Sequence, residues 1–190
     1  MFKIANSPVA IITNYRTGSS ALCRSISFEN NLASFPEPHI DKERQNDFFN
    51  HLDNKFVVKF MLDQVEKFDP YEQILKSDCF KIKLTRTDKV SQIASYYIAL
   101  MRDVWQNYTF DTTSPYFLSV DLDKINESIN RILTADKLLN DCNLKFDMIL
   151  TYEELGIITH TQSIKTVQPK NLNRIKTVIK KQLETYNNLY

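Results

Sequence analysis

Short apolar segments alternate with amphipathic segments along this chain, and the alternation constrains the fold more than any other feature. Each apolar segment has the length of a strand and is bounded by polar residues. The expected strands are Val9–Thr13, Phe56–Met61, Cys79–Thr85 and Phe146–Thr151. The helical patterns cover residues 19–32, 42–52, 65–75, 89–105, 123–139 and 172–186. Strands that alternate with helices pair in parallel and are covered on both faces. We therefore expect an α/β protein with three α/β/α layers and a central parallel sheet of about four to five strands.

The length and charge of the chain narrow its class further. A chain of 190 residues with 43% hydrophobic residues is typical of a globular protein, and we expect a single domain over residues 1–190. The formal net charge is +1, so no overall field recruits nucleic acid and we expect no such partner. No apolar run is long enough to cross a membrane and no signal segment is recognisable, which predicts a cytoplasmic protein without a membrane partner.

The cysteines and histidines give no sign of a metal site. Cys23, Cys79 and Cys142 are far apart in the sequence, and the three histidines form no recognisable ligand pair. We therefore expect free, packed thiols and no metal requirement.

The turn after the first expected strand is the strongest functional signal. Residues 13–20 read Thr-Asn-Tyr-Arg-Thr-Gly-Ser-Ser, and they contain one of only two glycines in the chain. Glycine is favoured where the backbone is left-handed or closely approached, and helix N-termini offer convergent N–H groups to phosphate or sulfate. The segment thus predicts an anion site. The alternative is an ordinary strand-to-helix turn capped by Ser19.

The sequence of this turn differs from the Walker A motif, which has two glycines separated by four residues and followed by lysine. Instead it resembles the 5′-phosphosulfate loop of sulfotransferases that use 3′-phosphoadenosine-5′-phosphosulfate (PAPS). In bacterial carbohydrate enzymes of that family the loop reads Pro-Arg-Thr-Gly-Ser. The residues that match this form are Arg16, Thr17, Gly18, Ser19 and Ser20, and Tyr15 replaces the usual proline.

A second segment has the same pattern of a strand ending in a cation and followed by a helix. Arg86 ends the strand, and Ser95 lies two turns along the expected helix. The segment resembles the 3′-phosphate motif of the same family, in the branch typified by trehalose 2-sulfotransferase. There an arginine and a helix serine hold the 3′-phosphate of the nucleotide. The alternative is a surface arginine and an unrelated serine, and Thr87 stands where many members of that branch have a second arginine.

Further matches occur in the same order along the chain. Residues 57–64, Trp105 and residues 150–155 resemble a strand, a helix-ending tryptophan and a late Tyr-Glu strand of that branch. Glu37, between two prolines, stands where the branch has its catalytic base. His39 is the second candidate for the base, because histidine titrates nearer neutral pH. The alternative for Glu37 is a solvated carboxylate in a turn.

The resemblance implies a P-loop-like fold and a sulfotransferase that uses PAPS to sulfate a hydroxyl acceptor, a carbohydrate or another small molecule. It implies that Arg16 stabilises the leaving phosphate, that residues 17–20 cradle the 5′-phosphate, and that Arg86 and Ser95 hold the 3′-phosphate. It is also compatible with a homodimer. Two alternatives stay open: a kinase-like P-loop enzyme, and a non-catalytic module that binds 3′,5′-adenosine bisphosphate (PAP).

Overall fold

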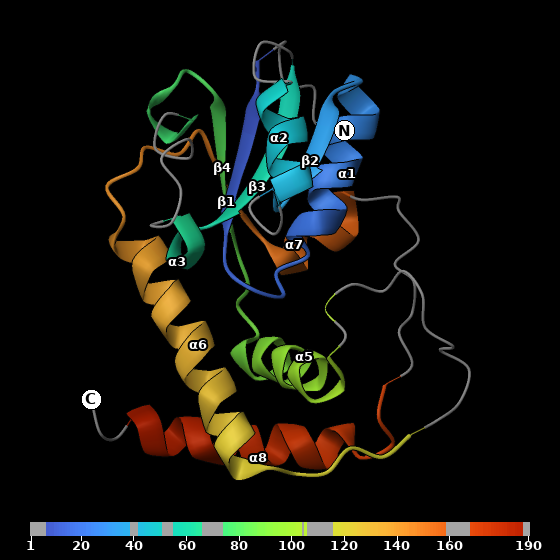
Figure 1. Cartoon of the computed structure of the whole chain (residues 1–190). Coiled ribbons are helices and arrows are strands. Elements are labelled where there is room, and N and C mark those ends of the chain that lie inside the picture. The colour runs from blue at the N-terminus through green and yellow to red at the C-terminus, as the bar shows by residue number, and fades with distance from the viewer. Residues whose placement is uncertain are drawn as a thin grey trace. The chain divides into compact units, whose positions relative to one another are not determined.

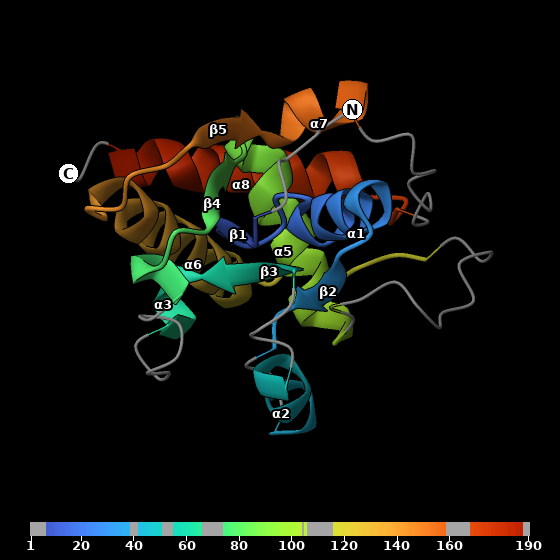
Figure 2. The same cartoon turned by 90° about the horizontal axis from the view of Figure 1, so that it is seen from above.

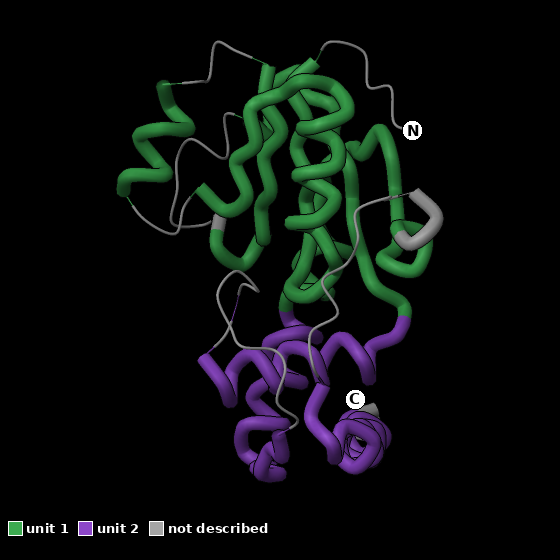
Figure 3. Tube along the Cα trace, turned by 90° about the vertical axis from the view of Figure 1, so that its right-hand side faces the viewer, with its two compact units in different colours: residues 1–87, 135–161 green, residues 88–134, 162–190 purple. Residues whose placement is uncertain are grey.

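The computed structural model describes residues 7–38, 42–50, 55–65, 74–103, 105, 116–158 and 168–187. The chain divides into two compact units, coloured separately in Figure 3. The first comprises residues 1–87 and 135–161, and the second comprises residues 88–134 and 162–190. Each unit combines two segments that are distant in sequence. Because each unit is discontinuous in sequence, a single linker does not separate the two units.

The first unit contains an open, five-stranded, all-parallel sheet with the strand order β2-β3-β1-β4-β5 (Figures 1 and 2). The strands are β1 (Val9–Thr13), β2 (Ala33–Pro36), β3 (Phe56–Met61), β4 (Phe80–Thr85) and β5 (Met148–Thr151). All residues of β1 and β3 are buried, as expected for central strands covered on both faces. This arrangement confirms the expected α/β class and the parallel sheet.

Helices cover both faces of this sheet. The first unit contains the helices α1 (Ser19–Asn30), α2 (Lys42–Asn50), α3 (Leu62–Val65) and α7 (Tyr152–Ile158), and the last seven residues of α6 (Leu122–Asp141). Alternate residues of β1 face opposite sides: Ile11 packs in one buried cluster with Leu22 of α1 and Leu155 of α7. Ile12 packs in the other cluster with Phe48 of α2. The period of two along β1 thus gives one core on each side, which completes the three layers.

The second unit is helical in the part of the chain that the structure describes. It contains α5 (Lys89–Arg102), α8 (Leu172–Asn187) and the first thirteen residues of α6 (Leu122–Asp141). Tyr97 of α5 is fully buried, donates a 2.5 Å hydrogen bond to the carbonyl of Ser119, and accepts one of 3.1 Å from the N–H of Asp121. Burial raises the pKa of the Tyr97 phenol. One aromatic side chain thereby ties the segment before α6 to α5.

The boundaries expected from the sequence agree with most elements, but β2, α7 and the short helix α3 were missed. The helix expected over residues 65–75 falls mostly outside the described residues. The strand β2 follows α1 after a short turn in which Asn31 is left-handed. Its sequence, Ala-Ser-Phe-Pro, has no marked alternation of apolar and polar residues, and only one of its four residues is buried. The strand therefore could not be recognised from the sequence. The second missed element is α7, which begins directly after β5 without a turn. Among the described residues, no helix has the length and apolarity needed to cross a membrane.

Candidate anion-binding site

The two segments singled out by sequence follow neighbouring strands of the sheet. β1 pairs in parallel with β4, and Thr13 lies opposite Leu84. The turn of residues 14–18, here called the anion loop, and Arg86 therefore both emerge at the carboxyl edge of the sheet. The connections from β1 and β4 lead to opposite ends of the strand order. In open α/β sheets, such a switch point is where ligands bind.

Gly18 is required by the shape of the anion loop. Its φ is 76°, and a Cβ atom placed there lies 2.8 Å from Cδ2 of Tyr152 and 3.2 Å from Cδ1 of Leu155. Gly18 is also the N-cap of α1, and no side chain caps this helix. The alternative of a turn capped by Ser19 is therefore wrong: Ser19 is the first helical residue.

The start of α1 leaves backbone donors available. The N–H groups of Ala21 and Leu22 reach back to the carbonyl of Gly18 at 3.0 and 3.1 Å. The N–H groups of Ser19 and Ser20 have no acceptor among the residues that the structure describes. Uncapped N–H groups at a helix start attract an anion.

The hydroxyl of Thr17 faces the protein interior. Thr17 is fully buried, its Oγ1 lies 2.6 Å from Oγ1 of Thr13, and it donates to the carbonyl of Asn14 at 3.1 Å. Thr17 thus stabilises the anion loop from inside, and its backbone N–H is the group that it can offer to a ligand.

Arg16 occupies the centre of the anion loop in a left-handed conformation, with φ 57°. Burial lowers the pKa of its guanidinium, and the charge of Arg86 lowers it further. The carboxylate of Glu37 acts in the opposite direction. Two guanidinium groups held close together in a partly buried site favour the binding of an anion.

Arg86 lies against the anion loop. Its Nη1 donates to the carbonyl of Arg16 at 3.2 Å, and its guanidinium carbon lies 4.2 Å from the centre of the Tyr152 ring. Its Nε is buried and has no hydrogen-bond partner among the residues that the structure describes. Buried donors are nearly always satisfied, so this atom can donate to a ligand.

Lys59 was not predicted as a site residue, although it lies in one of the segments that resemble the sulfotransferase branch. Lys59 is a buried cation in the middle of the apolar strand β3. Its Nζ lies 2.5 Å from Oε1 of Glu37 and donates to Oγ of Ser20 at 3.0 Å. Burial lowers its pKa, while the neighbouring carboxylate opposes that shift. The available signal was a single lysine in the sequence Phe-Val-Val-Lys-Phe-Met.

Glu37 follows directly after β2, which pairs with β3 so that Pro36 lies opposite Lys59. Glu37 is itself left-handed, with φ 61°. Such a conformation is rare for a residue before proline and is found mainly at functional sites. The second carboxylate oxygen of Glu37 makes no hydrogen bond with any described residue. The expected base is thus held beside the loop by one of its two oxygens.

The side chain of Tyr15 is anchored by α3, the short helix that follows β3. Its hydroxyl donates to Oδ2 of Asp63 at 2.6 Å and accepts from Nε2 of Gln64 at 3.3 Å. On the other side of the loop, Nδ2 of Asn14 donates to Oδ1 of Asp136 at 2.9 Å. These side-chain contacts hold the anion loop at Asn14 and at Tyr15.

The remaining predicted residues belong to the second unit or fall outside the described residues. Ser95 is on α5 and belongs to the second unit, as does Trp105, whose ring packs edge-on against Tyr96 at 5.2 Å. His39 lies outside the described residues.

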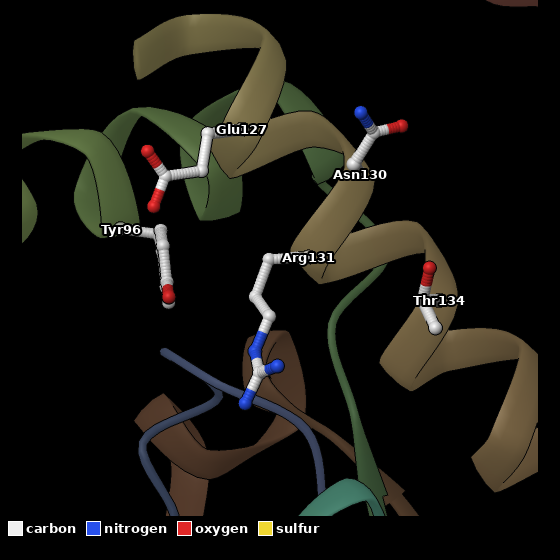
Figure 4. A pocket seen from close by; sticks show the side chains of 5 residues that line it. All are labelled: Tyr96, Glu127, Asn130, Arg131 and Thr134. Atoms are coloured by element: carbon white, nitrogen blue, oxygen red, sulfur yellow. The ribbon is translucent and has the colours of Figure 1, made fainter.

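The second unit also contains an open pocket of about 610 Å³. Figure 4 shows Tyr96 of α5 on one side and four residues of α6 on the other. These are Glu127, Asn130, Arg131 and Thr134.

Within the described ranges, no group of three or more His, Cys, Asp and Glu side chains is arranged to hold a metal ion. Cys23, Cys79 and Cys142 are free thiols, and burial raises the pKa of Cys23. Neither a scan against protein-family models nor a search of curated proteins finds a match for this chain.

Proposed function

We propose that this protein is a sulfotransferase that moves a sulfuryl group from PAPS to a hydroxyl acceptor, a carbohydrate or another small molecule. One observation carries the proposal. Arg16, Lys59 and Arg86 gather around an uncapped helix start, with one carboxylate, Glu37, beside them. Three cations and unpaired N–H groups suit a ligand that carries several negative charges.

The donor groups of the site fit a phosphosulfate. The N–H groups of Ser19 and Ser20 lack acceptors in the described structure, and the buried Nε of Arg86 lacks one too. A 5′-phosphate at the start of α1 supplies acceptors to the two N–H groups. A second phosphate at the end of β4 supplies one to Arg86. The assignment of Ser95 to that second phosphate stays a prediction from the sequence.

The chemistry assigned to the residues is in-line transfer. The acceptor oxygen forms a bond to sulfur, the bond from sulfur to the bridging phosphate oxygen breaks, and the acceptor proton passes to a base. Arg16 stabilises the charge that develops on the leaving phosphate oxygen. Positioning and charge stabilisation carry most of the rate in transfers of this kind.

Glu37 is the proposed base. Its Oε1 is bound by Lys59, which leaves Oε2 to accept the acceptor proton. Lys59 keeps the carboxylate at the loop and contributes a positive charge of its own. A base must lie within hydrogen-bond reach of the proton that it removes, and this contact fixes the carboxylate in one place.

The two alternatives differ in the ligand that they require. A kinase-like enzyme needs magnesium and a nucleoside triphosphate, whereas a non-catalytic module binds PAP without turnover. We also propose a cytoplasmic location, because the cysteines are unpaired. The homodimer remains a proposal that rests on the resemblance alone.

Thermal unfolding with PAP, AMP, PAPS, ATP, and ATP with magnesium tests the proposal. We expect PAP to stabilise the protein far more than AMP, by about 2.7 kcal/mol at one hundred times its dissociation constant. Ser95→Ala is expected to reduce the difference between PAP and AMP. Equal shifts from AMP and PAP overturn the 3′-phosphate assignment, and a response to ATP only with magnesium favours the kinase.

A further inference from the structure

The conformation of the anion loop is costly and needs support from outside the loop. Arg16 has φ 57° and Gly18 has φ 76°, so two left-handed residues lie within three positions. Glycine adopts the left-handed region without an energetic penalty, whereas arginine adopts it only at a cost in free energy. A non-glycine residue stays left-handed only where its surroundings determine the conformation. The contacts made by Arg16 and Gly18 therefore show which residues stabilise the conformation of the anion loop.

The first support comes from Arg86. Its Nη1 donates to the carbonyl oxygen of Arg16, the left-handed residue, at 3.2 Å. Arg86 follows β4 directly, and β4 is paired in register with β1, from which the loop begins. The sheet thus fixes the two ends of this hydrogen bond relative to each other. The donor is charged, which makes the bond stronger than one between neutral groups.

The second support comes from Tyr152, the first residue of α7. Its ring lies under the guanidinium of Arg86 at 4.2 Å, and it closes the space beside the Cα atom of Gly18. The Tyr152 hydroxyl makes no hydrogen bond among the described residues. The ring, and not the hydroxyl, is therefore what Tyr152 contributes.

We propose that Arg86 and Tyr152 are positioning residues that hold the anion loop in its ligand-binding conformation. The affinity of the loop for a 5′-phosphate then depends on Arg86 even when the ligand has no 3′-phosphate. The guanidinium has five donor hydrogens, and only Nη1 serves the loop, so the same side chain can still bind a second phosphate. Arg86 thereby couples the two phosphate positions. The binding part of this inference rests on the proposed function, whereas the loop-holding part does not.

Hydrogen exchange of the ligand-free protein tests the loop-holding part. The amides of Ala21 and Leu22 report on the loop because both bond to the carbonyl of Gly18. We expect about tenfold faster exchange at these amides in Arg86→Ala and in Tyr152→Ala, and wild-type exchange in Tyr152→Phe. The amides of β3 serve as the reference and are expected to keep their wild-type rates. Wild-type exchange at Ala21 and Leu22 in both alanine variants overturns the proposal, and so does an equal rise in β3.

Binding of AMP, which has no 3′-phosphate, tests the coupling. We expect about tenfold weaker AMP binding in Arg86→Ala and in Tyr152→Ala, with no change in Tyr152→Phe. Arg86→Lys keeps the charge but loses the planar group, and should restore only part of the affinity. A residue that served the 3′-phosphate alone would leave AMP binding unchanged, and that result overturns the coupling. If the wild type binds neither AMP nor PAP, the proposed function fails, and the exchange measurement alone decides the inference.

Discussion

Lys59 and Glu37 form a largely buried ion pair, with 2.5 Å between Nζ and Oε1 and side-chain exposures of 5% and 16%. The pair joins the middle of β3 to the residue that follows β2. Through Ser20, Lys59 also contacts the first turn of α1. A buried pair is weak evidence for stability by itself, but removing one partner leaves a charge without compensation. Its position beside the anion loop makes it the centre of the predictions below.

The first prediction concerns the stability contributed by this pair. Lys59→Met leaves the carboxylate of Glu37 without its cation, and we expect a loss of about 2 kcal/mol in the free energy of unfolding. The double variant Lys59→Met with Glu37→Gln removes both charges and should recover much of this loss. Urea denaturation measures all three proteins. A double variant no more stable than Lys59→Met contradicts the interpretation.

The second prediction concerns pH. Burial lowers the pKa of Lys59 below its usual value near 10.5. As pH rises from the lowered pKa to the ordinary one, the folded state loses the proton before the unfolded state does. The unfolded state then binds more protons, so the stability of the wild type rises in this window. Relative to Lys59→Met, the wild type should therefore gain stability as pH rises toward 10.5. Parallel curves for the two proteins speak against a lowered pKa.

The third prediction concerns Gly18. Gly18→Ala places a Cβ atom 2.8 Å from Cδ2 of Tyr152 and forces alanine into a left-handed conformation. We expect a loss of about 2 kcal/mol in stability, together with weaker AMP binding. Adding Tyr152→Ala removes the clash but keeps the backbone strain, so the double variant should recover only the steric part. Thermal unfolding with and without AMP measures both effects.

The fourth prediction concerns the base. Glu37→Gln keeps the shape of the side chain but removes its basicity, so we expect the transfer rate to fall about a hundredfold or more. Stabilisation by PAP should remain. Glu43→Gln, at an exposed position of α2, is the matched control and should leave the rate unchanged. If Glu37→Gln keeps its turnover and His39→Ala loses it, His39 is the base.

The fifth prediction separates the two arginines. Arg16→Ala should reduce kcat far more than PAP affinity, because its charge matters most as the leaving oxygen becomes negative. Arg86→Ala should mainly weaken nucleotide binding. Steady-state kinetics and PAP titration measure the two quantities separately. If both variants lose affinity alone, Arg16 is a binding residue without a role in the transfer.

The local elements and the phosphate-loop segment could be predicted because their signals lie within short stretches of sequence. The fully buried strands β1 and β3 are mostly apolar, and their bounds agree with the structure. A rare glycine after a strand also indicated a special backbone, which its φ of 76° bears out. The strand β2 was missed because four residues with one buried side chain give no period to detect.

What only the tertiary structure decided is which residues meet at the loop. Arg16, Glu37, Lys59, Arg86 and Tyr152 come from five separate segments. The strand order β2-β3-β1-β4-β5 brings these segments to the carboxyl edge of one sheet. The sequence by itself determined where most strands and helices and the special turn begin, because those depend on neighbours along the chain. The order and register of paired strands depend on the packing of the whole sheet. That packing alone set the carboxylate of Glu37 against Lys59 and the ring of Tyr152 under Arg86.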